Sequence, residues 1–184
     1  MEYVKIILII VGILLLLYVF ITFNKLIKLN NKVKEAFSTM DVYLKKRWDL
    51  IPNLVEVVKG YAKHENNSLK EIIELRNNAY DNFSNNEKIK TNNKLNNHLV
   101  KLMALVEHYP TLKADKNFLD LSNKLSKTED EIAQSRKYFN AVVRDYNNVV
   151  ESFPSNIIAK IFGYKSKLMF SINDEERNNI KVEL

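Results

Sequence analysis

The sequence contains no cysteine, and it has only three glycines and three prolines among its 184 residues. Without cysteine the chain cannot form a disulfide, carry a thiolate nucleophile or bind a metal through sulfur. So few helix breakers exclude a turn-rich β-sandwich and favour long helices. The glycines, at positions 12, 60 and 163, are too scattered to build a phosphate-binding loop.

The sequence also lacks the usual catalytic and metal-binding motifs. His64 precedes Glu65, but no second histidine follows at the spacing that H-E-x-x-H zinc sites need. His98 and His108 have no carboxylate or histidine three or four residues further on, and no E-x-x-H pair or G-x-S-x-G stretch occurs. We therefore predict no catalytic residues, no metal site, no cofactor and no enzymatic activity.

What the sequence does have is one long apolar run near its start. Residues 6–23, from Ile6 to Phe23, carry no charge over 18 positions. At about 1.5 Å per residue, this helix nearly spans the roughly 30 Å hydrocarbon core of a bilayer. A signal peptide is the alternative, but its apolar region is usually only about 7–15 residues long and is followed by small residues. Because "TFNKLIKLNNK" follows here, we predict a retained single-pass anchor over residues 1–24.

Basic residues follow the anchor closely. Residues 25–47 hold seven basic and two acidic residues, giving +5 of the chain's net charge of +6. The positive-inside rule then places the N-terminus outside and the rest in the cytoplasm, at the plasma membrane. A basic stretch beside a bilayer favours contact with anionic lipid over nucleic-acid binding. The candidate lipid contacts are Lys25, Lys28, Lys32 and Lys34.

Beyond the anchor, apolar residues recur at helical spacing in four segments. The pattern predicts amphipathic helices with coiled-coil-like packing. In the first segment Asn30 and Arg47 are the polar members of the apolar stripe. The stripes are Phe23, Leu26, Val33, Phe37, Met40 and Leu44; Ile51, Val55, Val58, Ala62, Leu69, Ile72, Ala79 and Phe83; Leu95, Leu99, Leu102 and Val106; and Phe118, Leu121, Leu125, Thr128, Ile132, Ser135, Phe139, Val142, Tyr146, Val149 and Phe153.

Breaks between the stripes predict the connections. Pro52 in "WDLIPN" predicts a turn that closes the first helix, although the stripe passes Pro52 almost in phase. We expect "SNNEKIKTNN" to be a polar connection, "YPTLKADKN" a corner, and "IIAKIFGY" a short amphipathic helix ended by Gly163. The expected fold is all-α: an anchor, then an up-down-up-down antiparallel four-helix bundle over residues 25–163, then a polar tail over residues 164–184.

Two groups of polar residues are candidate sites. Glu65 and Arg76 interrupt an apolar stripe, and Glu129 and Arg136 lie one residue off another. They predict a buried polar layer, while a solvated face explains them equally well. Lys45, Lys46, Arg47, Trp48 and Asp49 surround the predicted turn, and we expect a half-buried Trp48 with an exposed basic rim that docks a partner.

Several long stretches together resemble the LemA family of bacterial membrane proteins. They are "DVYLKKRWDLIPNLVEVVKGYAKHE", "LRNNA", "EHYPTLKADKNF", "LSKTEDEIAQSRKYFNAVVRDYN" and "SFPSNIIAKIFGY". The resemblance implies an N-terminal anchor with its N-terminus outside, a cytoplasmic four-helix bundle, and an accessory membrane role without catalysis or cofactor. Some relatives occur beside membrane metalloproteases, and one branch takes part in magnetosome formation.

The sequence thus supports two hypotheses of different kinds. The first is a membrane-tethered, non-catalytic scaffold or adaptor that docks a protein partner, with another membrane protein as one candidate. The alternative is a lipid-binding or membrane-remodelling protein that acts through its basic juxtamembrane helix and the short helix near Gly163. The location of exposed apolar surface discriminates between them.

Overall fold

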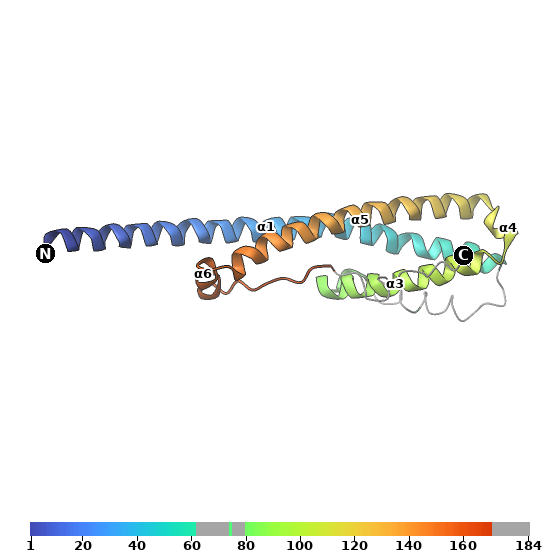
Figure 1. The fold of residues 1–184 in the computed structure, drawn as a ribbon. Helices are drawn as coiled ribbons and strands as arrows, with labels where there is room; N and C mark the ends of the chain where they lie inside the picture. Colours follow the sequence, from blue (N-terminus) through green and yellow to red (C-terminus); the bar gives the residue numbers. More distant parts are fainter. Residues whose placement is uncertain (62–73, 75–79, 171–184) are drawn as a thin grey trace, which may run out of the picture. The chain divides into compact units, whose positions relative to one another are not determined.

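The computed structural model describes residues 1–61, 74 and 80–170, and every regular element in these ranges is a helix. The elements are α1 (Glu2–Tyr61), a 3-10 turn η1 (Tyr80–Asn82), α3 (Asn85–Val106), α4 (Pro110–Lys113), α5 (Lys116–Glu151) and α6 (Ser155–Ile161) (Figure 1). The chain divides into two units, Met1–Thr39 with Ser135–Met169, and Met40–Gln134 with Phe170–Leu184. Each unit is considered by itself below.

Helix α1 is the one described helix that is long and apolar enough to cross a membrane. Its most apolar 18 residues have a mean hydropathy of 3.2, and only 6% of these residues are buried within the protein. A core helix of this hydropathy would be buried against its neighbours, so the exposed surface fits a lipid-facing segment. The helix is therefore consistent with the predicted membrane anchor.

The turn predicted at Asp49–Pro52 is wrong, because α1 continues through Pro52 to Tyr61. A proline inside a helix costs about 3 kcal/mol, mainly through one lost hydrogen bond and a ring clash. Here the residues on both sides of Pro52 bury the same stripe, so their burial offsets that cost. The buried residues are Leu44, Trp48, Ile51, Leu54, Val55 and Val58. Ala62, Leu69, Ile72 and Ala79 of the predicted second stripe lie outside the described residues.

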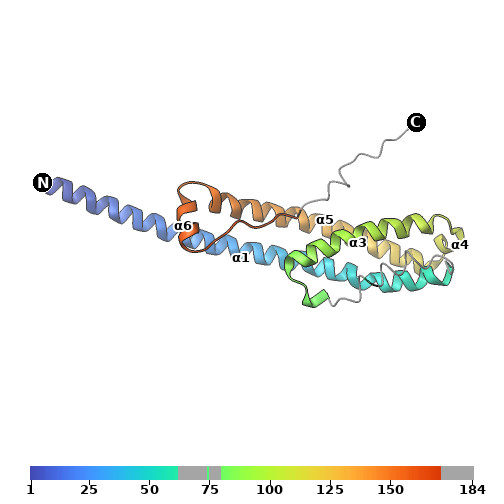
Figure 2. The same ribbon diagram turned by 90° about the horizontal axis from the view of Figure 1, so that it is seen from below.

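In the unit formed by residues 40–134, α3 lies beside the cyan end of α1 (Figures 1 and 2). The predicted core positions of α3 are confirmed, since Leu95, Leu99, Leu102 and Val106 are all buried. The expected polar connection "SNNEKIKTNN" is instead largely helical. Ser84 and Glu87 form a capping box, in which each side chain bonds the other's backbone N–H, and this starts α3 at Asn85.

In the unit formed by residues 1–39 and 135–169, the orange end of α5 and helix α6 lie beside α1 (Figures 1 and 2). The rings of Phe37 and Phe139 are 5.8 Å apart, and both side chains are buried. Gly163 ends α6 with a φ of +75°, which a residue with a Cβ rarely adopts. The backbone N–H of Tyr164 then bonds the Ala159 carbonyl at 2.9 Å, as in a Schellman motif.

Residues 164–169, called the return segment below, run back along α5. The side chain of Asn147 donates to the Lys167 carbonyl at 2.8 Å and accepts from the Lys167 N–H at 2.9 Å. The Tyr146 hydroxyl donates to the Lys165 carbonyl at 3.0 Å. Backbone groups that would otherwise need water are thus satisfied by two neighbouring α5 side chains. Residues 171–184 of the predicted polar tail lie outside the described residues.

Candidate functional site

Arg47 is the centre of the candidate site, and its side chain is fully buried. It lies on the apolar stripe of α1, three residues after buried Leu44 and four before buried Ile51. The helical period therefore directs Arg47 inward. The sequence correctly placed Arg47 on this stripe, but the expectation of an exposed basic rim at this position is wrong.

The Arg47 guanidinium joins three helices. One Nη donates to both carboxylate oxygens of Glu129 on α5, at 2.9 and 3.0 Å. The other Nη donates to the backbone carbonyl and the side-chain oxygen of Asn92 on α3, at 3.1 and 2.5 Å. A planar fork with several donors suits this arrangement, whereas a lysine could not reach both partners with the same geometry. Arg47, Glu129 and Asn92 are called the Arg47 cluster.

A second polar group, the Asp41 cluster, lies one to two turns earlier on α1. The carboxylate of Asp41 accepts a hydrogen bond from the Tyr80 hydroxyl and another from the Lys88 ammonium, both at 2.6 Å. The Lys88 ammonium also stands 4.8 Å from the centre of the Tyr80 ring, within cation–π range. Burial, and then the hydrogen bond to Asp41, raise the pKa of Tyr80 above its ordinary value of 10.0.

Trp48 belongs to the same core. It is 5% exposed, and its ring lies 5.4 Å from the Tyr80 ring and 6.3 Å from the Phe83 ring. The prediction of a half-buried Trp48 is therefore wrong, because the continuous helix turns this position towards η1 and the start of α3. The aromatic contacts anchor η1 on α1.

Of the predicted docking corner, Lys46 and Asp49 are exposed and Lys45 is partly exposed. Lys45 pairs with Asp49 one helical turn away, at 2.8 Å. Lys46 pairs with Glu131 of α5 at 3.0 Å, and about half of the Lys46 side chain is exposed. Pairs with this exposure typically contribute only about 0–1 kcal/mol to stability. These charges remain accessible, and their docking role stays a prediction.

Only two of the four residues of the predicted buried polar layer are among those that the structure describes. Glu65 and Arg76 lie outside the described residues. Glu129 is about one-third exposed and belongs to the Arg47 cluster, while Arg136 on α5 is half-buried. Glu129 therefore forms an interhelical ion pair with Arg47, a residue that the sequence assigned to the docking corner.

Asn92, Tyr80 and Lys88 are site residues that sequence reasoning missed. A signal was present for two of them. Lys88 and Asn92 continue the Leu95–Leu99 stripe of α3 backwards at helical spacing, so they are polar residues in core positions. Because "SNNEKIKTNN" was predicted to be a connection, the helical spacing of Lys88 and Asn92 was not used. Tyr80 had no comparable periodic signal.

A shallow groove runs between α3 and α5 within the same unit. It encloses about 430 Å³ and has an apolar floor with a polar rim. Val100, one of its lining residues, is 63% exposed. Its lining is Asn96, Leu99, Val100, Met103, Ser122, Leu125, Ser126 and Glu129.

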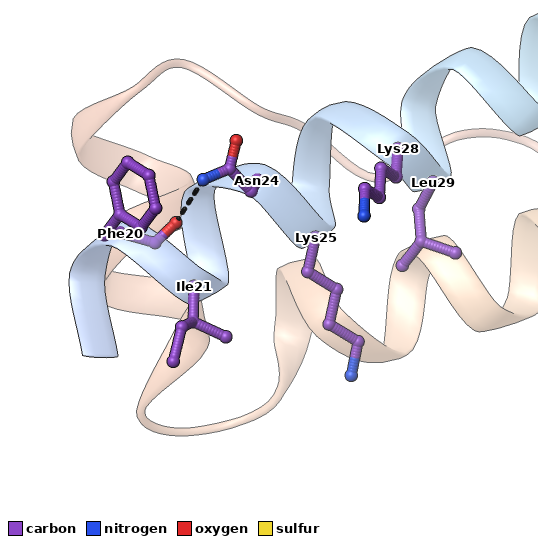
Figure 3. A pocket seen from close by; sticks show the side chains of 6 residues that line it. All are labelled: Phe20, Ile21, Asn24, Lys25, Lys28 and Leu29. Atoms are coloured by element: carbon purple, nitrogen blue, oxygen red, sulfur yellow. Dashed lines mark hydrogen bonds between the residues drawn. The ribbon is translucent and has the colours of Figure 1, made fainter. Parts of the chain in front are cut away.

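The predicted lipid contacts Lys25, Lys28, Lys32 and Lys34 are exposed along α1. Lys25 and Lys28 line a pocket of about 610 Å³ together with Phe20, Ile21, Asn24 and Leu29 (Figure 3). The figure shows Phe20 and Ile21 at one end of this pocket, and Lys25, Lys28 and Leu29 further along the helix. The Asn24 amide donates to the Phe20 carbonyl at 3.0 Å, so it is held on its own helix.

Among the residues that the structure describes, no group of three or more His, Asp or Glu side chains converges. Arg47 and Asn92 are buried and bond to each other, while Asp41 and Lys88 are partly buried and also form a pair. Arg47, Asn92, Asp41 and Lys88 all use their side chains to join helices, so the arrangement provides rigidity and alignment.

The chain is thus an all-helical protein in the residues described. Its N-terminal helix is apolar enough to cross a membrane, and the helices that follow are joined by ion pairs. The chain belongs to the LemA family, whose model matches residues 36–184. It is 23% identical over 158 residues to Protein LemA of Metamycoplasma hominis, covering 85% of this chain and 72% of that protein. It is 38% identical over 69 residues to the magnetosome protein MamQ of Magnetospirillum gryphiswaldense, covering 38% of this chain and 25% of that protein.

Proposed function

We propose that this LemA-family protein is a non-catalytic scaffold, anchored in the plasma membrane by its N-terminal helix, that presents a helical domain to a protein partner in the cytoplasm. The observation that supports this most is the Arg47 cluster. Fully buried Arg47 bonds α5 and α3 from α1, and we propose that this cluster serves to align the three helices, since a buried ion pair by itself is weak evidence for added stability. The proposal includes an up-down-up-down four-helix bundle over residues 25–163.

The groove between α3 and α5 is the surface that we propose for docking. Its Leu99, Met103 and Leu125 floor suits the apolar side of an amphipathic helix, and methionine adapts its shape to a partner. Serines on the α5 rim can bond polar residues of the same helix. The occupant is therefore an amphipathic helix of a partner protein, with a membrane protein as the favoured source.

Crosslinking in native membranes tests this proposal. A photoreactive amino acid at Val100 should join the chain to a discrete partner, because Val100 stands at the groove edge. Lys127 is the matched control, since it is exposed on α5 about 200° around the helix from Leu125. Equal crosslinking from Val100 and Lys127 would place the partner elsewhere, and a strong crosslink from Lys46 alone would favour the Lys45–Asp49 corner.

Lipid binding through the basic juxtamembrane part of α1 is the second candidate function. The pocket around Lys25 and Lys28 favours it, because apolar and cationic side chains adjoin there as acyl chains and phosphates do in a bilayer. Changing Lys25, Lys28, Lys32 and Lys34 to serine should then reduce binding of the full chain to fluorescent phosphatidylglycerol in detergent micelles. Unchanged binding would leave these lysines a role in topology alone.

A further inference from the structure

We infer that the short helix α6 and the corner before it form a second membrane contact, embedded in the headgroup layer beside the end of the anchor. This inference rests on the proposed insertion of α1, and it does not depend on protein docking. Three observations carry it: the position of α6 along α1, the apolar side chains that it exposes, and the lysines around them.

The position of α6 along α1 is fixed by contacts within one unit. The Phe162 ring lies 4.4 Å from the Phe23 ring, and Phe23 is the last residue of the apolar run. A small cavity is lined from α1 by Tyr18, Ile21, Thr22 and Lys25, and from the α5–α6 corner by Asn148, Val149, Ser152 and Ser155. The α5–α6 corner therefore lies at the level of residues 18–25 of α1.

That level corresponds to the surface of the bilayer. An 18-residue apolar helix is about 27 Å long, close to the roughly 30 Å hydrocarbon core, so the core ends near Phe23. Lys25 and Lys28 follow directly, as expected for residues among the headgroups. Side chains packed beside Phe23 must therefore meet the headgroup and upper acyl region.

The corner exposes large apolar side chains at this level. Phe153 is 80% exposed, and Ile157 and Ile161, one helical turn apart, are 52% and 72% exposed. Their neighbours Ile158 and Ala159 are buried, so one face of α6 packs against the protein and another face is exposed. Such a concentration of exposed apolar side chains is costly in water and is typical of a surface that meets another phase.

Basic residues accompany the apolar ones, which favours an anionic bilayer over an apolar protein surface. Lys160 lies between the two exposed isoleucines, and Lys165 follows α6 in the return segment. The acidic residue here, Glu151, accepts a hydrogen bond from the Ser166 hydroxyl at 2.5 Å. Apolar side chains flanked by lysines match the composition of interfacial helices that insert below the phosphates.

Labels on single cysteines test this inference in the full chain, because the sequence has no cysteine of its own. Ile161→Cys and Ile157→Cys would each carry an environment-sensitive fluorophore in vesicles of mixed phosphatidylcholine and phosphatidylglycerol. Lipids spin-labelled near the headgroup end of the acyl chain should quench both labels at least several-fold more than soluble iodide does. Two positions are used so that a folding defect at one does not decide the result.

Two further labels serve as controls. Tyr138 is 46% exposed on α5, about 20 Å along the helix from Ser152, so a label at Tyr138→Cys should be quenched by iodide and little by the lipid. Leu14→Cys reports on the anchor and should be quenched by lipids spin-labelled near the chain end.

The inference is overturned if the labels at Ile157 and Ile161 respond as Tyr138 does while Leu14 is quenched by lipid. Shielding of both labels from iodide and from lipid would also overturn it, because a second protein would then cover the corner. Loss of lipid quenching at Leu14 would show that α1 is not inserted, and both the anchor and the α6 contact would then fail.

Discussion

One Nη of the Arg47 guanidinium donates to both carboxylate oxygens of Glu129, at 2.9 and 3.0 Å, although the two residues are 82 positions apart in the sequence. The two ends differ in environment, because the Arg47 side chain is fully buried while that of Glu129 is 35% exposed. The charge of Arg47 has therefore lost its water, and it depends on Glu129 for compensation.

Glu129→Gln should accordingly lower the free energy of unfolding of the full chain in detergent by about 1.5–3 kcal/mol, the range for hydrogen bonds to charged groups. This range lies below the roughly 3–5 kcal/mol of a fully buried pair because water reaches part of Glu129. The measurement is chemical unfolding followed by fluorescence of Trp48, the only tryptophan.

The matched control is Glu131→Gln, two residues further along α5. Glu131 pairs with Lys46, whose side chain is 48% exposed, so its loss should cost only about 0–1 kcal/mol. Equal shifts for the two variants would show that Glu129 contributes no more than a surface pair does.

The raised pKa of Tyr80 predicts that the folded protein loses stability in alkaline solution. This pKa is raised in the folded state, first by burial and then by the hydrogen bond to Asp41. The folded protein thus keeps this proton at pH values where the unfolded chain has released it. The stabilisation is complete below the unfolded pKa of about 10 and decreases as the pH rises above it.

Unfolding measured between about pH 9 and pH 11 should therefore show a steeper decline for the natural chain than for Tyr80→Phe, which has no proton to lose. Tyr61→Phe is the comparison variant, because Tyr61 is exposed and its hydroxyl bonds Asp115 at the surface. The free energy of unfolding of Tyr61→Phe should fall between about pH 9 and pH 11 almost as much as that of the natural chain. If Tyr80→Phe declines as steeply as the natural chain, another group is responsible.

The sequence predicted the helical class and most of the core positions listed here, because both depend on local periodicity, and it predicted a helix apolar enough to cross a membrane from one uninterrupted apolar run. Leu95, Leu99, Leu102 and Val106 are buried as their spacing indicated. It failed at Pro52, where a strong local rule for ending a helix competed with tertiary burial of Leu54, Val55 and Val58. Propensity is a weak prior when an apolar stripe continues in phase on both sides.

The candidate site was harder to predict for a related reason. Arg47 stood on the apolar stripe, which indicated burial, but the presumed turn at Asp49–Pro52 favoured exposure. Its partners Asn92 and Glu129 come from α3 and α5, and only the packing of these helices selects them among many polar residues. Periodicity shows which side of a helix is buried, whereas it does not show which residue of another helix lies opposite.

The docking corner gives a prediction that avoids the buried arginine. Lys45→Ser with Lys46→Ser should change the free energy of unfolding by no more than about 1 kcal/mol, because both side chains are partly exposed. If the corner docks the partner, crosslinks formed in native membranes should weaken at least several-fold. Adding Arg47→Ser would confuse the result, since that change also removes a core contact. Undiminished crosslinks would assign docking to the groove or to another surface.

The orientation of the anchor is predicted from the lysines that follow it. Ser38→Cys lies on an exposed face of α1, 15 residues beyond Phe23. An impermeant thiol reagent should leave it unlabelled in intact cells and label it after permeabilisation, because the positive-inside rule places it in the cytoplasm. Glu2→Cys, before the apolar run, should show the opposite pattern. Labelling of Ser38→Cys in intact cells would reverse the topology.

The last prediction concerns Asn147, which holds the return segment on α5. Its side chain makes two hydrogen bonds with the backbone of Lys167, and each such bond contributes about 0.5–1.5 kcal/mol. Asn147→Ala should therefore open residues 164–169 on the order of tenfold to a hundredfold more often, with less effect on the α5 helix itself. Trypsin should cleave after Lys165 and Lys167 correspondingly faster. Asn148→Ala is the control, since Asn148 is the exposed neighbour on the same helix. If both variants are cut at the rate of the natural chain, contacts such as Phe23 with Tyr164, at 6.5 Å, retain the segment without Asn147.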